Sequence, residues 1–145
     1  MKYIILIRAI SITIMAINNK RLLLACRYND LELLELLLDW GADVNFTNSQ
    51  SEAPLMVACR EGHSRIVARL LQEEELDVNK KDDLGRPALL SALIHGKTDC
   101  AKLLSKDERL DWNKTDMLEI IFNASVREAF HSYSRQIQIL FLLSI

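Results

Sequence analysis

The feature that most constrains this chain is a short pattern that recurs every 33 or 34 residues. The tetrapeptide LACR at residues 24–27 returns 33 residues later as VACR at residues 57–60. The tripeptide DVN at residues 43–45 returns at steps of 34 residues, as DVN at 77–79 and as DWN at 111–113. A fixed period of this size is typical of repeat proteins, in which each unit stacks on its neighbours to bury its hydrophobic face. The sequence therefore predicts an array of similar units.

Each unit has the pattern of two short helices and a turn. In the first unit, residues 21–28 form an apolar segment that Asn29 and Asp30 interrupt, since both residue types favour caps and turns. Residues 31–40 then repeat leucine at the spacing of one broad helical face. Gly41 ends this second helix, because glycine most easily takes the left-handed conformation just past a helix. The position four residues after the alanine of each first helix is turn-forming in all three units: Asn29, Gly62 and Gly96.

The segment KRLLLACRYNDLELLELLLDWGADVN, residues 20–45, resembles the ankyrin repeat without a gap. That repeat has about 33 residues, a turn and two antiparallel helices. Units at 20–52, 53–86 and 87–116 follow the pattern, and KKDDLGR at 80–86 is similar to the Asp-x-x-Gly hairpin of the family. The resemblance implies an all-α ankyrin-repeat solenoid of stacked antiparallel helix pairs with hairpin loops, flanked by hydrophobic end segments.

The two ends of the chain differ from the middle. Residues 1–19 carry two charged side chains, Lys2 and Arg8, and half of the isoleucines of the chain. The apolar stretch at 3–17 is shorter than the roughly 20 residues that span a bilayer. We interpret residues 1–19 as a hydrophobic cap over the open end of the array, with a signal or membrane anchor, or a segment without native structure, as alternatives. Residues 117–145 are interpreted as a degenerate fourth repeat or a helical C-terminal cap, because terminal repeats are atypical.

No motif for catalysis or metal binding is recognisable in the sequence. The net charge of −2 argues against a nucleic-acid-binding protein, which usually carries a basic excess. Cys26, Cys59 and Cys100 fall at positions where the repeat places small core residues, so we expect buried, unpaired thiols in a reducing compartment. The three histidines show no metal-ligand spacing. We therefore predict that the chain is not an enzyme and that it binds no metal or cofactor.

The resemblance implies a non-catalytic protein–protein interaction module that binds its partner through the concave face and the hairpin tips. Repeat arrays present such an extended concave surface. The partner-binding positions that the ankyrin pattern leaves free close the first helices and form the hairpins: Arg27, Tyr28, Ser49, Gln50, Glu52, Arg60, Glu61, Asp83, Leu84, Arg86, Ile94 and His95.

A second hypothesis is a regulatory or ligand-sensing portion of a larger enzyme or signalling protein. It is based on residues 70–90, which are loosely similar to late repeats of the oligoadenylate-dependent ribonuclease, whose ankyrin domain binds a nucleotide. We expect a monomer in the cytoplasm, or alternatively in the nucleus, that binds another protein and no nucleic acid. A secreted or membrane-anchored protein is a third hypothesis, and residues 3–17 alone support it.

Overall fold

The computed structural model describes residues 1–111. Within these residues the chain forms six helices: α1 (Lys2–Tyr28), α2 (Leu31–Asp39), α3 (Pro54–Glu61), α4 (Ser64–Leu70), α5 (Ala88–Ile94) and α6 (Thr98–Ser105). They form three successive pairs, which confirms the prediction of an all-α array of helix pairs. The predicted cap or fourth repeat at 117–145, and the end of the third unit at 112–116, lie outside the described residues.

Left-handed residues separate the two helices of each pair. Asn29 has φ 59° and Gly62 has φ 84°, and each closes the first helix of its unit. Gly96 takes φ 66° at the same place in the third unit. In the first unit Asp30 then caps α2, because its carboxylate accepts the N–H of Leu33 at 2.9 Å. The turn-forming position read from the sequence therefore corresponds to a backbone conformation that glycine and asparagine adopt most readily.

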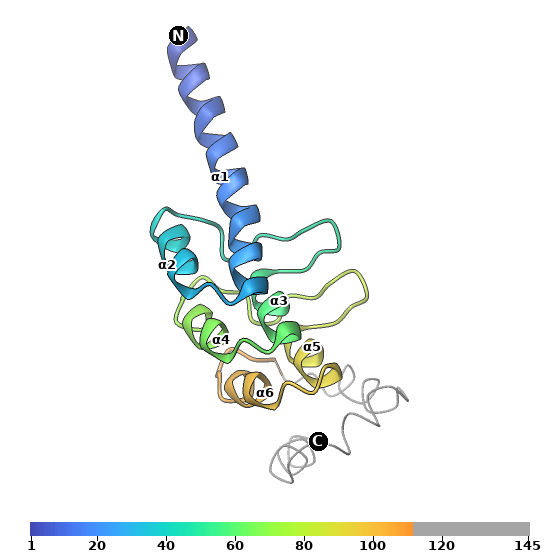
Figure 1. Ribbon diagram of the computed structural model, residues 1–145. Coiled ribbons are helices and arrows are strands. Elements are labelled where there is room, and N and C mark those ends of the chain that lie inside the picture. The colour runs from blue at the N-terminus through green and yellow to red at the C-terminus, as the bar shows by residue number, and fades with distance from the viewer. Residues whose placement is uncertain (112–145) are drawn as a thin grey trace.

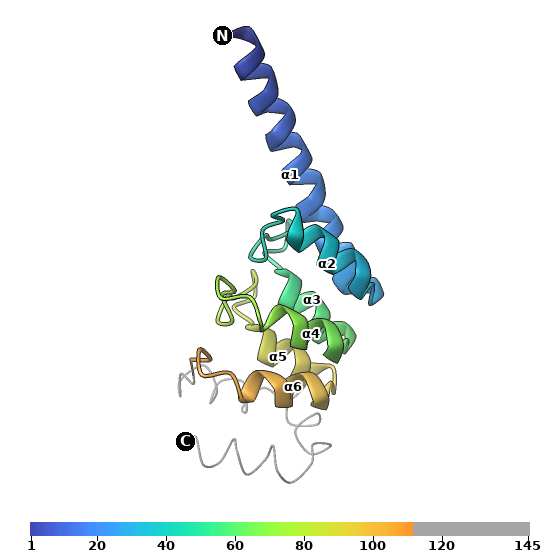
Figure 2. The same ribbon diagram turned by 90° about the vertical axis from the view of Figure 1, so that its left-hand side faces the viewer.

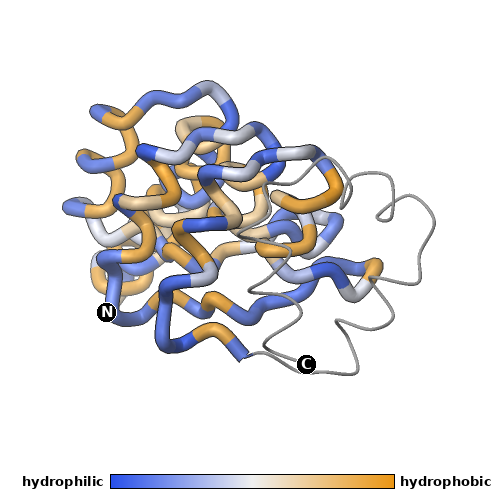
Figure 3. Tube along the Cα trace, turned by 90° about the horizontal axis from the view of Figure 1, so that it is seen from below, coloured by the Kyte–Doolittle hydropathy of each residue, from blue (hydrophilic) through white to orange (hydrophobic). Residues whose placement is uncertain are grey.

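The helices lie in two layers. α1, α3 and α5 pack side by side as the inner layer, and α2, α4 and α6 form the outer layer (Figures 1 and 2). One continuous hydrophobic core lies between the layers, and its fully buried side chains include Leu22, Leu34, Leu55, Ile66 and Leu104. The loops that connect the helices are mostly hydrophilic (Figure 3). The hairpins after α2 and α4 project to the same side, beyond the inner helices (Figure 1).

Asparagine side chains join each loop to the next repeat. Asn45 Oδ1 accepts the N–H of Asp77 at 2.8 Å, and Asn45 Nδ2 donates to the carbonyl oxygen of Glu75 at 2.6 Å. Asn79 makes the same two bonds to the loop after α6, each at 2.7 Å. Asn19 on α1 accepts the first such N–H, from the loop after α2, at 2.8 Å. The asparagine of each of the first two DVN tripeptides, Asn45 and Asn79, therefore holds its loop in register with the loop of the next repeat.

α1 departs from the predicted unit, because it begins at Lys2 and not at residue 21. No glycine or proline precedes Asn29 in the sequence, so no residue breaks the helix before that point. Residues 1–17 are exposed along their whole length and project away from the array (Figure 1). The interpretation of this segment as a cap over the open end is therefore wrong. Among the described helices, α1 is the one long and apolar enough to cross a membrane.

All three cysteines lie within the described residues, are buried and form no disulfide, as predicted. Burial raises the pKa of the Cys26 thiol to about 12, because a thiolate is disfavoured away from water. Burial likewise raises the pKa of Cys59 well above its ordinary value of 9.0. Cys26 and Cys59 therefore behave as small hydrophobic groups of the core.

Candidate partner-binding surface

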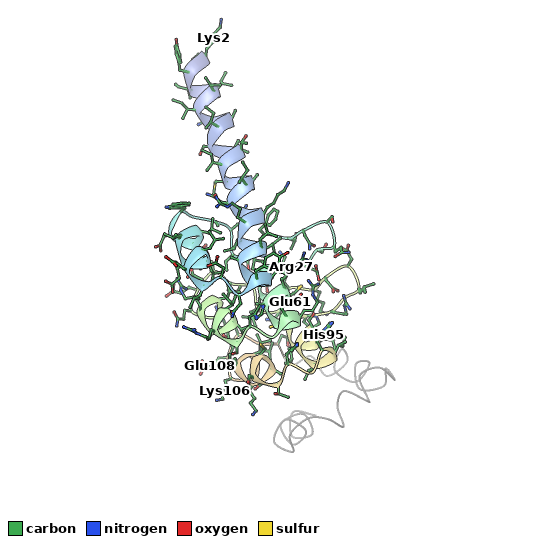
Figure 4. The ribbon with its side chains drawn as sticks, viewed as in Figure 1. Lys2, Arg27, Glu61, His95, Lys106 and Glu108 are labelled. Carbon is green, nitrogen blue, oxygen red and sulfur yellow. The ribbon has the colours of Figure 1, made fainter. Side chains whose placement is uncertain are left out.

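The ends of the three inner helices form one column on the surface. Arg27 lies at the end of α1, Glu61 at the end of α3 and His95 directly after α5, one below the other (Figure 4). Tyr28, the last residue of α1, is 73% exposed, whereas Ile94 is partly buried. The repeat register therefore predicted correctly that these five side chains close successive inner helices.

Two histidines make structural bonds at this column. His63 Nε2 lies 3.0 Å from the carbonyl oxygen of Arg27 and so links the second repeat to the end of α1. His95 Nδ1 lies 2.8 Å from the carbonyl oxygen of Ser91. Since a carbonyl oxygen only accepts, each of these ring nitrogens carries a proton. In the described part of the chain, no three His, Cys, Asp or Glu side chains gather where they could hold a metal ion.

A hollow of about 500 Å³ lies between α1 and the first hairpin. Leu23, Leu24 and Phe46 supply apolar surface, and Lys20 and Arg27 are its two cations. No acidic side chain lines the hollow, and within residues 1–111 neither cation has an ion-pair partner. The other lining residues are uncharged: Thr47, Asn48, Ser49 and Val57. We call this site the basic hollow.

The tips of the two hairpins are bonded to each other. Ser51 Oγ donates to Asp83 Oδ1 at 2.6 Å, and the N–H of Asp83 donates to the carbonyl oxygen of Gln50 at 3.3 Å. Ser49 and Gln50 are exposed on the first tip, and Leu84 is 74% exposed on the second. Four of the predicted contact residues therefore lie together on one edge, and Ser49 also lines the basic hollow.

Arg86, a predicted contact residue, is half-buried and stabilises the second hairpin. Its Nε donates to Asp82 Oδ2 at 2.8 Å, and the N–H groups of Leu84 and Arg86 donate to Asp82 Oδ1 at 2.9 Å each. Burial alone raises the pKa of Asp82, but these bonds outweigh it and hold the pKa below the ordinary value of 3.8. The carboxylate therefore fixes the hairpin as an anion.

The expectation that Glu52 is free to contact a partner is wrong, because its residue is only 7% exposed. Its carboxylate accepts from Asn48 Nδ2 at 2.9 Å and forms an ion pair with the guanidinium of Arg60. Arg60 also bonds Glu61 at 3.2 Å. Glu52 and Arg60 thus fasten the base of the first hairpin to α3. Asp83, Leu84 and Glu61 keep more of their surface for a partner.

Sequence reasoning missed seven of the nine residues that line the basic hollow, among them Lys20, Leu24 and Phe46. Lys20, Leu24 and Arg27 are spaced i, i+4 and i+7, which places them on one face of α1, so a signal for two of them was present. Phe46 follows directly after the asparagine of the first DVN tripeptide. Its position depends on how the hairpin folds back onto α1, which the repeat pattern does not encode.

The repeat register, the two layers of helices and the linked loops can be compared with known proteins. A family model described as ankyrin repeats, in three copies, matches residues 22–116. The chain belongs to the ankyrin-repeat family. Ankyrin repeats are protein–protein interaction modules, and the match confirms the resemblance read from the sequence.

Three relatives align with about half of the length of this ankyrin chain. It is 43% identical over 72 residues to a protein of Plasmodium falciparum (isolate 3D7) named as a candidate E3 ubiquitin-protein ligase, a match covering 47% of this chain and 1% of that protein. It is 35% identical over 68 residues to the ankyrin repeat protein YahD of Escherichia coli (strain K12), covering 47% and 34%. It is 42% identical over 72 residues to a candidate E3 ubiquitin-protein ligase of Oryza sativa subsp. japonica, covering 49% and 14%. The chain therefore spans 34% or less of the length of each of these relatives.

Proposed function

We propose that this ankyrin array binds a protein partner and catalyses no reaction itself. The observation that carries the proposal is the basic hollow, in which Lys20 and Arg27 lie beside the apolar side chains of Leu24 and Phe46 and have no ion-pair partner within residues 1–111. Such a surface favours a ligand that brings an apolar side chain and a carboxylate close together, because charge complementarity steers and selects partners. A segment of a protein with neighbouring acidic and apolar residues has this chemistry.

The contact surface extends from the basic hollow in two directions. Along the inner helices it reaches Tyr28 and the column of Arg27, Glu61 and His95 (Figure 4). Towards the hairpins it reaches the linked tips that carry Leu84. Tyrosine and arginine are among the residue types enriched at binding hot spots. We therefore propose that Arg27 and Tyr28 contribute most to affinity.

The experiment reverses the charge of the basic hollow. The variant Lys20→Glu with Arg27→Glu changes both cations, and the control Arg65→Glu with Lys106→Glu changes two exposed cations of the outer layer by the same net charge. Partners captured by the full chain are identified by mass spectrometry, and their affinity for the three proteins is then titrated. Loss of a hot spot costs about 2 kcal/mol or more, so affinity should fall by about 30-fold in the first variant and persist in the control.

Thermal melting of both variants should match that of the unchanged protein, since surface substitutions usually alter stability by less than about 0.5 kcal/mol each. Equal loss of affinity in both variants, or loss in the outer-layer control alone, would contradict the proposal.

A second candidate function is the recognition part of a larger enzyme. Two relatives that match about half of this chain carry names of E3 ubiquitin-protein ligases, and the matched part makes up a small share of each. In that case the array still recognises a partner, and the chemistry belongs to other segments. Incubation of the chain with an activating enzyme, a conjugating enzyme, ubiquitin and ATP should give no conjugates. Conjugates that depend on the chain would contradict the non-catalytic proposal.

We also infer that the array works in a reducing compartment, with the cytoplasm first and the nucleus second. Three buried cysteines without a disulfide support this inference, since oxidising compartments favour paired cysteines. Protease protection in cells that express the tagged chain should place the repeats in the cytoplasm or nucleus, free or on the cytoplasmic face of a membrane. Recovery in a secreted fraction would contradict it.

A further inference from the structure

The first part of α1 leaves a continuous row of large apolar side chains in water. Soluble monomers rarely expose contiguous apolar patches larger than a few hundred Å² unless they bind something. Within residues 1–111 no other element covers this part of the helix (Figure 1). The exposed large apolar side chains of the segment are Tyr3, Ile4, Ile5, Leu6, Ile7, Ile10, Ile12, Ile14, Met15 and Ile17.

The apolar side chains surround the helix on every side. Residues 4–7 are four consecutive apolar residues, and successive residues are rotated by about 100° around an α-helix. A groove of a partner protein, or a second copy of the helix, would cover one stripe and leave the opposite side in water. A helix that is apolar all round is typical of a protein core or a membrane. The hydrocarbon of a lipid bilayer can cover this segment on all sides at once.

The polar groups of the segment are compatible with lipid. The hydroxyl of Thr13 donates to the carbonyl oxygen of Ala9 at 2.9 Å, so this donor is satisfied inside the helix. The segment has two charged side chains, Lys2 and Arg8, both basic. Long basic side chains can reach from an apolar environment to the headgroups, and they favour anionic lipids.

The dimensions and the surroundings of the helix base agree with a membrane surface. Lys2 stands at the free end of α1 (Figure 4), and from Lys2 to Ile17 the helix rises about 22 Å, which reaches through most of the hydrocarbon thickness of about 30 Å. Trp40 follows α2 and is 60% exposed, and the loop after it bonds to Asn19 at the base of the segment. Tryptophan is enriched at membrane–water interfaces.

Charges of both signs surround this base. Lys20 and Arg21 are exposed on α1. Asp39 at the end of α2 and Asp43 in the loop that follows are exposed as well. The base therefore has little net charge, and the attraction to anionic lipid comes from Lys2 and Arg8 within the segment.

We propose that residues 2–17 insert into a lipid bilayer that contains anionic lipids, and that the ankyrin array stands on its surface with Trp40 at the headgroup level. Asn18 is buried and Asn19 bonds to the array, so the repeats begin where the apolar segment ends. Because α1 is continuous, the inserted segment holds the first repeat directly at the membrane. This role is independent of the protein partner proposed for the basic hollow.

The test is flotation of the full chain with vesicles of phosphatidylcholine and phosphatidylserine in a 4:1 ratio. The variant Ile5→Asp with Ile12→Asp places two carboxylates on the exposed segment. The matched control, Tyr28→Asp with Leu84→Asp, makes two similar changes at exposed apolar positions of the array. We expect the unchanged chain and the control to float, and the floating fraction of the first variant to fall at least tenfold, while the melting temperature of the array is unchanged.

Two further readouts distinguish whether lipid or protein covers residues 2–17. Vesicle addition should shift the tryptophan emission to shorter wavelength, and Trp40→Phe should remove most of that shift. Failure of the unchanged chain to float, or equal flotation of the Ile5→Asp, Ile12→Asp variant, would overturn the proposal. A dimer in light scattering that persists with vesicles and stays in the soluble fraction would overturn it in favour of a second copy.

Discussion

One continuous helix passes through two very different environments. In the last third of α1, Leu22, Ala25 and Cys26 are buried while Arg27 and Tyr28 face the solvent. In the first part of the helix, every residue up to 17 is exposed although most of them are apolar. The difference shows that hydrophobic content does not decide where a helix packs in this chain. The distribution of apolar residues around the helix decides whether it packs, because a repeat helix can bury one apolar face and leave its polar face in water.

Of the substitutions that compare the packed array with the exposed segment of α1, those in the hydrophobic core should have the largest effect on stability. Ile66 on α4 is fully buried, whereas Ile12 is 69% exposed. Ile66→Ala should therefore cost about 2–5 kcal/mol of unfolding free energy, because it removes buried contacts and leaves a cavity. Ile12→Ala should alter stability by less than about 0.5 kcal/mol. Urea denaturation followed by circular dichroism measures both, and similar costs for the two would show that residues 1–17 are packed in solution.

The next effect concerns two arginines. Arg60 pairs with buried Glu52, whereas Arg8 lies on the exposed part of α1 and has no ion pair among the described residues. Arg60→Ala should cost about 2–3 kcal/mol, since it leaves a buried carboxylate without its cation. Arg8→Ala should cost almost nothing in water. Restored stability in the double variant Arg60→Ala with Glu52→Gln would assign the loss to the unpaired carboxylate, and a persistent loss would contradict that cause.

A smaller effect is expected from the bonds that link the loops. Asn45 bonds to Asp77 and Glu75 in the next repeat, whereas the bond of Thr13 stays inside its own helix. Asn45→Ala should cost about 1–2 kcal/mol, because two bonds between repeats are lost. Thr13→Val keeps the shape of the side chain and should leave the array unchanged. Thermal melting compares them, and an unaltered Asn45→Ala protein would show that the loops are held by packing alone.

The smallest effect is that of acid, and it acts on the array because residues 1–17 carry no carboxylate. The pKa of Asp82 is lowered from 3.8 in the folded state, so its stabilisation is present above pH 3.8 and is lost as the pH falls through the lower folded value. Asp107 behaves in the same way, because its bond from Arg109 lowers its pKa. Melting temperature should therefore fall by a few degrees below pH 3.8. Asp82→Asn should flatten this fall, and an equally steep fall in that variant would exclude Asp82 as a source.

Much of the array could be predicted from the sequence, because local signals and the period agree. Asn29 and Gly62 mark the same left-handed turn, and the DVN tripeptides mark loops that bond across repeats. Glu52 was misjudged because its partner Arg60 reaches it only after the hairpin folds back. The start of α1 was misjudged although its signal was present, since no helix-breaking residue lies between Lys2 and Tyr28.

Hydrogen–deuterium exchange of the full chain, with and without the phosphatidylserine-containing vesicles, tests most directly that α1 combines a repeat helix with a lipid-bound segment. In water, residues 22–28 should be protected by the array, and residues 2–17 should exchange fast, because a helix without tertiary packing is marginal. With vesicles, residues 2–17 should become protected while the exchange of residues 22–111 is unchanged. Strong protection of residues 2–17 in water, or no change on adding vesicles, would contradict this division of the helix.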